Sequence, residues 1–99
     1  MIYVVATASV KPEKREDFMN GARACIAETV KEKGCLLYDC HGSVGDPGRF
    51  VFVEKWETRD DLMAHAKSDH LKAWRKLSAD FVTGPTKVEI VTPEKVDVM

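Results

Sequence analysis

The sequence lacks the features that mark most cofactor-dependent and membrane-bound classes of protein. It has no glycine-rich phosphate loop, no dinucleotide-binding fingerprint and no serine nucleophile elbow. No apolar run reaches the length of a bilayer span, and no basic residue precedes Lys11 as one would in a secretory signal. We therefore predict a cytoplasmic protein without a membrane segment, whose chemistry runs without a cofactor.

An excess of one charge is also missing. The chain mixes 15 basic and 16 acidic residues over 99 positions, which gives a formal net charge of -1. This balance leaves no basic stripe for a phosphate backbone, so nucleic acid is not expected as a partner. Cys25, Cys35 and Cys40 are odd in number and lack the Cys-x-x-Cys spacing of redox or zinc sites, which predicts buried thiols.

The length and the hydrophobic content of 44% predict one domain with one core. We place this domain at residues 1–92. Residues 93–99 include the charged residues Glu94, Lys95 and Asp97, and they form either a tail or an arm that reaches a second subunit.

Hydrophobic periodicity and turn residues predict an alternation of strands and helices. Thr58 is suited to cap a helix, Gly84-Pro85 ends the pattern that follows, and the helical stripes change near Ser68-Asp69, which predicts a break there. In chain order, the predicted elements are strand 2–10, a helix that begins at Pro12 and stops before Gly34, strands 35–43 and 49–57, a broken helix after Thr58, and strand 87–92.

This order is the split βαβ arrangement of ferredoxin-like α+β folds, with a four-stranded antiparallel sheet and both helices on one face. The residues expected on the two faces of the sheet are apolar alike. Phe50 and Phe52 alternate with Val51 and Val53, and in strand 35–43 Leu36 and Tyr38 are expected to oppose Cys35 and Leu37. We therefore predict a homodimer that packs through the sheet face left bare by the helices.

Glu54 is the first candidate for chemistry. It alternates with Phe50, Phe52 and Trp56, so its carboxylate is expected to point into an apolar environment that raises its pKa unless a donor satisfies it. The carboxylate either holds a proton-bearing ligand and orients a histidine, or forms a structural hydrogen bond or ion pair.

His65 is the candidate general base, because it shares a helical stripe with Leu62 and should face the sheet. It could equally be a core histidine with its hydrogen bonds satisfied. His70 begins the next stripe with Trp74 and either lines a pocket or only packs. The five-residue step between the histidines does not place both on one face of a regular helix, and no third ligand is spaced to complete a metal site, so no metal is predicted.

Aromatic residues supply flat walls for an aromatic ligand, or simply belong to the core. The candidates for substrate binding are Trp56, Trp74, Tyr38 and Phe52. His41, near the end of strand 35–43, either sits at a pocket mouth or is solvated.

The motifs now on the page resemble those of the antibiotic biosynthesis monooxygenase family, whose members are small dimeric α/β barrels of ferredoxin-like fold. The resemblance is carried by Phe52-Val53-Glu54-Lys55-Trp56-Glu57, Leu62-Met63-Ala64-His65 and Ser68-Asp69-His70-Leu71-Lys72-Ala73-Trp74. It is strongest for the bacterial quinol monooxygenase branch and the related protein that degrades the autoinducer-2 signal, whose Thr-Gly-Pro segment is similar to Thr83-Gly84-Pro85.

The resemblance implies a function. Family members that oxidise hydroquinone-like phenols with dioxygen use no flavin, haem or metal. By this resemblance His65 is the base, Glu54 and His70 hold or polarise substrate oxygens, and the aromatic ring lies between Trp56, Trp74 and Tyr38. The expected partners are therefore a small aromatic molecule and dioxygen.

Three other functions are weighed against quinol oxidation: the first is disfavoured, and the other two stay open. A haem-degrading branch shares the fold, but its key positions correspond here to Thr7, His65 and Arg75, which depart from its pattern. An isomerase-like enzyme acting on a small phosphorylated carbonyl compound would need cations, for which Lys55, Lys67 and Lys72 are the nearby candidates. A non-catalytic ligand-binding dimer is the third alternative.

Overall fold

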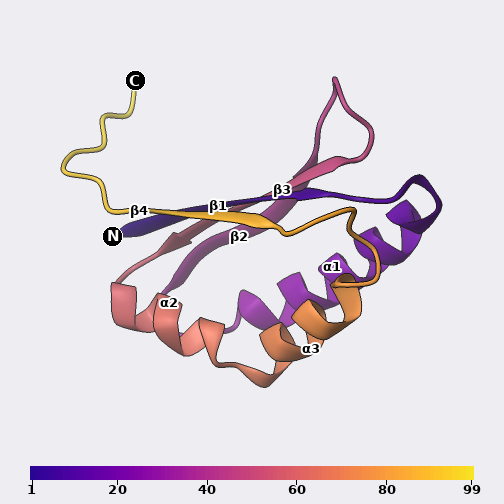
Figure 1. The fold of residues 1–99 in the computed structure, drawn as a ribbon. Coiled ribbons are helices and arrows are strands. Elements are labelled where there is room, and N and C mark those ends of the chain that lie inside the picture. The colour runs from indigo at the N-terminus through magenta and orange to yellow at the C-terminus, as the bar shows by residue number, and fades with distance from the viewer.

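The computed structural model describes the whole chain, residues 1–99, as one layer of helices packed on one sheet (Figure 1). The elements in chain order are β1 (Ile2–Ser9), a 3₁₀ turn (Pro12–Lys14), α1 (Arg15–Thr29), β2 (Cys35–Gly42), β3 (Arg49–Trp56), α2 (Arg59–Ala66), α3 (Asp69–Ser78) and β4 (Lys87–Val91). No helix is both long enough and apolar enough to cross a bilayer.

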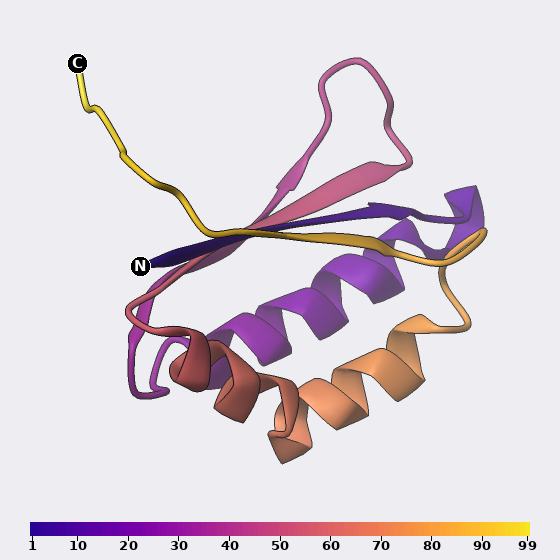
Figure 2. The ribbon, with the colours of Figure 1, turned by 60° about the vertical axis from the view of Figure 1, so that its left-hand side comes forward.

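The four strands are antiparallel to their neighbours and stand in the order β2-β3-β1-β4. All helices lie on the same side of this sheet, as the two views show (Figures 1 and 2). This is the predicted ferredoxin-like α+β architecture with helices on one face, and the prediction is confirmed.

Residues two apart along the strands share the face that meets the helices. In β1 the alternation is strict, because Ile2, Val4, Ala6 and Ala8 are buried while the residues between them are less so. Facing positions in β3 supply Phe50, Phe52, Glu54 and Trp56. One polar group, the Glu54 carboxyl, is thus placed in an otherwise apolar layer.

The helices cover this face through short buried stripes. In α1 the buried residues Phe18, Ala22, Cys25 and Thr29 follow at steps of four, three and four, which is one face of a helix. The Phe18 ring stands at the centre of the core, with its centroid 5.0 Å from that of Phe50.

The predicted break in the last helix is confirmed, and two capping residues explain it. The Thr58 hydroxyl accepts from the Asp61 backbone N–H at 3.1 Å and starts α2. The Ser68 hydroxyl accepts from the Leu71 N–H at 3.3 Å and starts α3. The chain therefore changes direction at Lys67–Ser68, and the residues on either side of the break no longer follow one helical period.

Some local predictions were wrong. The helix before Gly34 ends at Thr29, and the chain turns until Gly34, whose φ of +79° suits glycine. A β-bulge between Cys35 and Leu37 inserts an extra residue, so Leu36 does not share a face with Tyr38. The strands end one residue earlier than predicted at Ser9, Gly42, Trp56 and Val91. Of the three cysteines, only Cys25 is fully buried.

The face of the sheet that carries no helix is largely apolar. Tyr3, Val5, Val51 and Val53 lie there partly exposed at the centre, and Leu37 lies toward the β2 edge. Residues 93–99 leave the end of β4 without packing on the sheet (Figure 2).

Candidate active site

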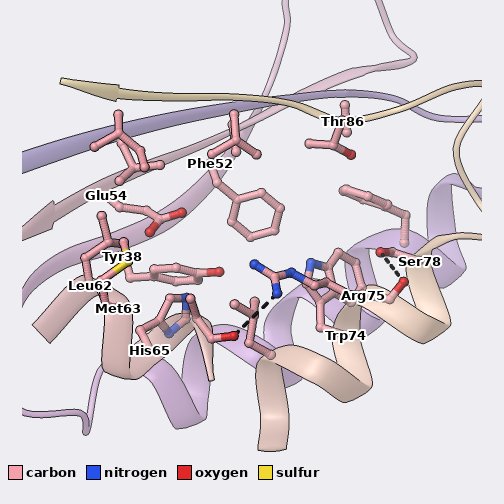
Figure 3. Close-up of a pocket in the computed structure, with 18 residues that line it drawn as sticks. Tyr38, Phe52, Glu54, Leu62, Met63, His65, Trp74, Arg75, Ser78 and Thr86 are labelled. Carbon is pink, nitrogen blue, oxygen red and sulfur yellow. Dashed lines mark hydrogen bonds between the residues drawn. The ribbon is translucent and has the colours of Figure 1, made fainter. Parts of the chain in front are cut away.

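A cavity of about 200 Å³ lies between the sheet and the two C-terminal helices. Its walls are mostly apolar, with polar groups from Tyr38, Glu54, His65, Arg75, Ser78 and Thr86 (Figure 3). The cavity opens along β4, where the lining residues Val88 and Ile90 are 58% and 42% exposed. It is thus an apolar chamber with a few polar groups, the usual form of a small-molecule site.

His65 stands in the wall of this cavity near the end of α2, and its side chain is 3% exposed. Its Nδ1 lies 2.6 Å from Oε2 of Glu32, in the turn that follows α1. Because a carboxylate only accepts, this contact places a proton on Nδ1. No protein group bonds Nε2, which is therefore the ring nitrogen available to a ligand.

The packing around His65 fixes the plane of its ring. The imidazole centroid is 4.8 Å from that of Trp56 and 5.2 Å from that of Tyr38. Burial lowers the pKa of His65 from its ordinary value of 6.5, and the hydrogen bond to Glu32 acts in the opposite direction. The imidazole is consequently neutral at pH 7 and able to accept a proton.

Glu54 lies on the sheet side of the cavity and is 6% exposed. The Trp56 indole N–H donates to its Oε1 at 3.0 Å. Burial raises the pKa of Glu54 above its ordinary value of 4.5, and the indole hydrogen bond lowers it in part. This carboxyl can thus exchange a proton with a ligand at a higher pH than a solvated glutamate can.

Tyr38 supplies a hydroxyl from β2. Its only hydrogen-bond partner is the Cys25 sulfur at 3.8 Å, and burial raises the pKa of the phenol. Tyr38 therefore stays a neutral hydroxyl that can donate to a ligand oxygen in the cavity.

The structure brings most of the predicted site residues to one cavity. His65, Glu54, Trp74, Tyr38 and Phe52 all line it. Two predicted residues do not. Trp56 is fully buried behind Glu54 and His65, so it supports them without forming a wall. His70 lies outside the lining, with its Nε2 3.5 Å from Oε2 of Glu32.

His41 is exposed on β2, 3.6 Å from the Asp39 carboxylate, and does not line the cavity. Two residues of the site escaped prediction. Glu32 carries no local signal, because its contact to His65 spans 33 positions of the chain. Arg75 lines the cavity although it is itself exposed, next to the buried Trp74 on α3, and it was considered only as a departure from the haem-degrading pattern.

Glu32, His65 and His70 together have the composition of a metal site, since their ligand atoms lie within 4.8 Å of one another. The prediction from sequence spacing that no third ligand is present did not consider Glu32, which lies far from both histidines along the chain. Metal bonds of about 2.1 Å at tetrahedral angles would hold two ligand atoms roughly 3.4 Å apart. The His65–Glu32 contact of 2.6 Å is shorter and has the length of a strong hydrogen bond. In this geometry the two residues form a hydrogen-bonded pair, with the proton on Nδ1 of His65.

Comparisons with known proteins agree with this fold. The family model described as "Antibiotic biosynthesis monooxygenase" matches residues 1–77. The chain is 31% identical over 88 residues to "Putative monooxygenase YcnE" of Bacillus subtilis (strain 168), covering 89% of this chain and 93% of that protein. It is 29% identical over 84 residues to "Probable quinol monooxygenase YgiN" of Escherichia coli (strain K12), covering 75% of this chain and 81% of that protein.

Among solved structures, "Putative antibiotic biosynthesis monooxygenase from Nitrosomonas europaea" superimposes with a TM-score of 0.91 at 34% identity, covering 96% of this chain and all of that one. Fold and cavity define a ferredoxin-like domain with a single helical layer. The chain belongs to the antibiotic biosynthesis monooxygenase family, as its motifs indicated.

Proposed function

We propose that the protein is a monooxygenase that oxidises a quinol or another phenolic aromatic molecule with dioxygen and without a bound cofactor. Membership of the family and the names of the relatives support an oxidoreductase. The observation that carries the proposal is the His65 imidazole in the wall of an apolar cavity, whose Nδ1 is held by Glu32 and whose Nε2 bonds no protein group. This is the arrangement of a general base with an orienting carboxylate.

The reaction begins with a proton transfer. His65 Nε2 accepts the proton of a substrate hydroxyl, and Glu32 stabilises the imidazolium that forms. The resulting quinolate passes one electron to dioxygen, and the semiquinone and superoxide combine in a new carbon–oxygen bond. With the proton from His65 this adduct is a hydroperoxide. Loss of the ring C–H proton and cleavage of the O–O bond release water and leave a hydroxylated quinone.

The other polar groups suit the second half of the reaction. The ring gains one oxygen atom and loses two hydrogens, and the second oxygen leaves in water. Glu54, whose pKa is raised by burial, can supply a proton to the departing oxygen. The Tyr38 hydroxyl can donate to a carbonyl or quinolate oxygen. Apolar walls on the sheet and helix sides reduce the contact of the reduced dioxygen with bulk water.

Oxygen consumption with 1,4-naphthohydroquinone tests the proposal, corrected for autoxidation measured without protein. We expect His65→Gln to lose most of the catalysed rate, since glutamine cannot act as a base. His41→Gln, at an exposed histidine outside the cavity, is the matched control and should keep wild-type turnover. Wild-type rates in the His65→Gln variant would refute His65 as the base, and no catalysis across a panel of quinols would favour an isomerase-like or non-catalytic protein.

We also propose that the protein is a homodimer joined through the bare face of the sheet. The support is the apolar centre of that face, where Val5 and Val53 lie side by side on paired strands. A single copy of the chain leaves them in contact with water. Val53→Lys should yield a monomer in light scattering at micromolar concentration, whereas the wild type scatters as a dimer. A monomeric wild type would contradict this proposal and leave the oxidation chemistry untouched.

A further inference from the structure

We infer that the substrate carries an oxyanion substituent, a carboxylate or a phosphate, and that Arg75 binds it in the cavity. This inference rests on the proposed function, because it describes the ligand of the same site. Arg75 is the only lysine or arginine that lines the cavity. Lys55, Lys67 and Lys72, the cations expected from the sequence, do not line it, and Lys55 lies on the other side of the sheet over the Tyr3 ring.

The Arg75 guanidinium has no acidic partner. It forms no ion pair, and its one hydrogen bond is a long contact of 3.4 Å from Nη1 to the Ala66 carbonyl oxygen at the end of α2. A guanidinium carries five N–H donors, so four are left for other groups. The side chain is turned from α3 toward the part of the cavity where Tyr38 and His65 lie (Figure 3).

The other charged groups of the cavity do not neutralise this cation. Glu54 is the only carboxyl in the lining, and it forms no ion pair with Arg75; its Oε1 accepts instead from the Trp56 indole N–H. Arg75 is close enough to His65 to contribute to lowering the pKa of that imidazole. An arginine beside an apolar wall and near a base thus offers a planar pair of donors for the oxyanion of an aromatic acid.

The geometry also orients the ligand. An aromatic ring against Phe52 and Trp74 would direct its oxyanion to Arg75 and a hydroxyl to Nε2 of His65. Ser78 and Thr86 add hydroxyls to the lining on the side where the cavity reaches β4. An uncharged quinol would fill the same space but leave the guanidinium to water, so the anionic ligand should bind more tightly.

Equilibrium binding at pH 7 tests this inference without turnover. Calorimetric titrations would compare 1-naphthol, 1-naphthoate and 1-naphthyl phosphate, which share one ring system and differ in the substituent. We expect either or both anions to bind about tenfold more tightly than the naphthol, the gain of one charge-assisted contact near solvent. Naphthoate and naphthyl phosphate distinguish a carboxylated substrate from a phosphorylated one.

Variants on α3 assign the effect to one residue. Arg75→Gln keeps hydrogen-bonding capacity without the charge and should abolish the preference for the anions over the naphthol. Lys76→Gln removes a neighbouring exposed cation that does not line the cavity and should keep the preference. Equal binding of all three compounds to the wild type, or a preference that survives Arg75→Gln, would overturn the inference. A preserved preference in a protein that oxidises no quinol would instead refute only the proposed reaction.

Discussion

Replacing Glu32 with glutamine isolates the charge of the carboxylate behind His65. Glutamine has nearly the same shape, and its carbonyl oxygen can still accept from the Nδ1–H at the 2.6 Å position. The variant therefore keeps the tautomer and loses the negative charge that stabilises the imidazolium. A hydrogen bond to a charged group contributes about 1.5–3 kcal/mol, so kcat/KM should fall about 10- to 150-fold.

The same substitution should move the pH profile. Burial holds the pKa of His65 below 6.5, and the charge and hydrogen bond of Glu32 raise it. Without the carboxylate the pKa falls further, so the acid limb of kcat/KM shifts to lower pH while the plateau drops. The titratable groups that surround this imidazole are Glu32, Tyr38, Glu54, His70 and Arg75. Of these, Glu32 alone bonds to the ring, so its removal should dominate the shift.

The assay is initial-rate oxygen consumption with 1,4-naphthohydroquinone between pH 5 and 8. Glu28→Gln is the matched control, because Glu28 is an exposed carboxylate one helical turn earlier that pairs only with Lys31. It should reproduce the wild-type rate and profile. If Glu32→Gln kept both the plateau and the acid limb of the wild type, Glu32 would not act through His65. The proposed pairing of the general base His65 with Glu32 would then be wrong.

Three further predictions concern stability measured by urea unfolding. Phe18→Ala should cost about 3–5 kcal/mol, since the ring is buried at the centre of the core, and a loss below 1 kcal/mol would contradict that placement. Gly34→Ala should cost at least about 1–2 kcal/mol, because φ is +79° and a Cβ would clash with the Asp61 side chain, whereas Gly84→Ala, in open space, should be neutral. Burial raises the pKa of Glu54, so the folded state binds this proton more readily than the unfolded state, and stability falls as pH rises above 4.5. Glu54→Gln should flatten this pH dependence of the unfolding free energy. An unchanged slope would argue against burial of the charge.

The sheet and its helical face could be predicted because alternation in β1 and β3 repeats over eight residues each. The extra residue at Leu36 could not be predicted, since a bulge changes the register without changing the apolar character of the segment. Strand ends were off by single residues because fraying ends depend on their neighbours.

The residues of the site also fall into those that the sequence could predict and those that it could not. Glu54 and His65 could be placed in the cavity wall because each lies on an apolar stripe of its own element. Glu32 and Arg75 could not be predicted as site residues, since Glu32 reaches His65 from a turn 33 positions away and Arg75 lines the cavity from an exposed helical position. Trp56 was expected to contact the substrate because a sequence does not distinguish an aromatic wall from the aromatic layer beneath it.

The break between α2 and α3 at Ser68 lets His65 and His70 hold neighbouring elements together. A continuous helix would carry the two imidazoles to different sides, whereas the bend lets both approach the carboxylate that follows α1. The Glu32 side chain therefore connects the turn after α1 with the last turn of α2 and the first turn of α3. A proton or ligand that weakens the contacts of Glu32 with the two histidines should therefore speed amide hydrogen exchange in the short helix α2.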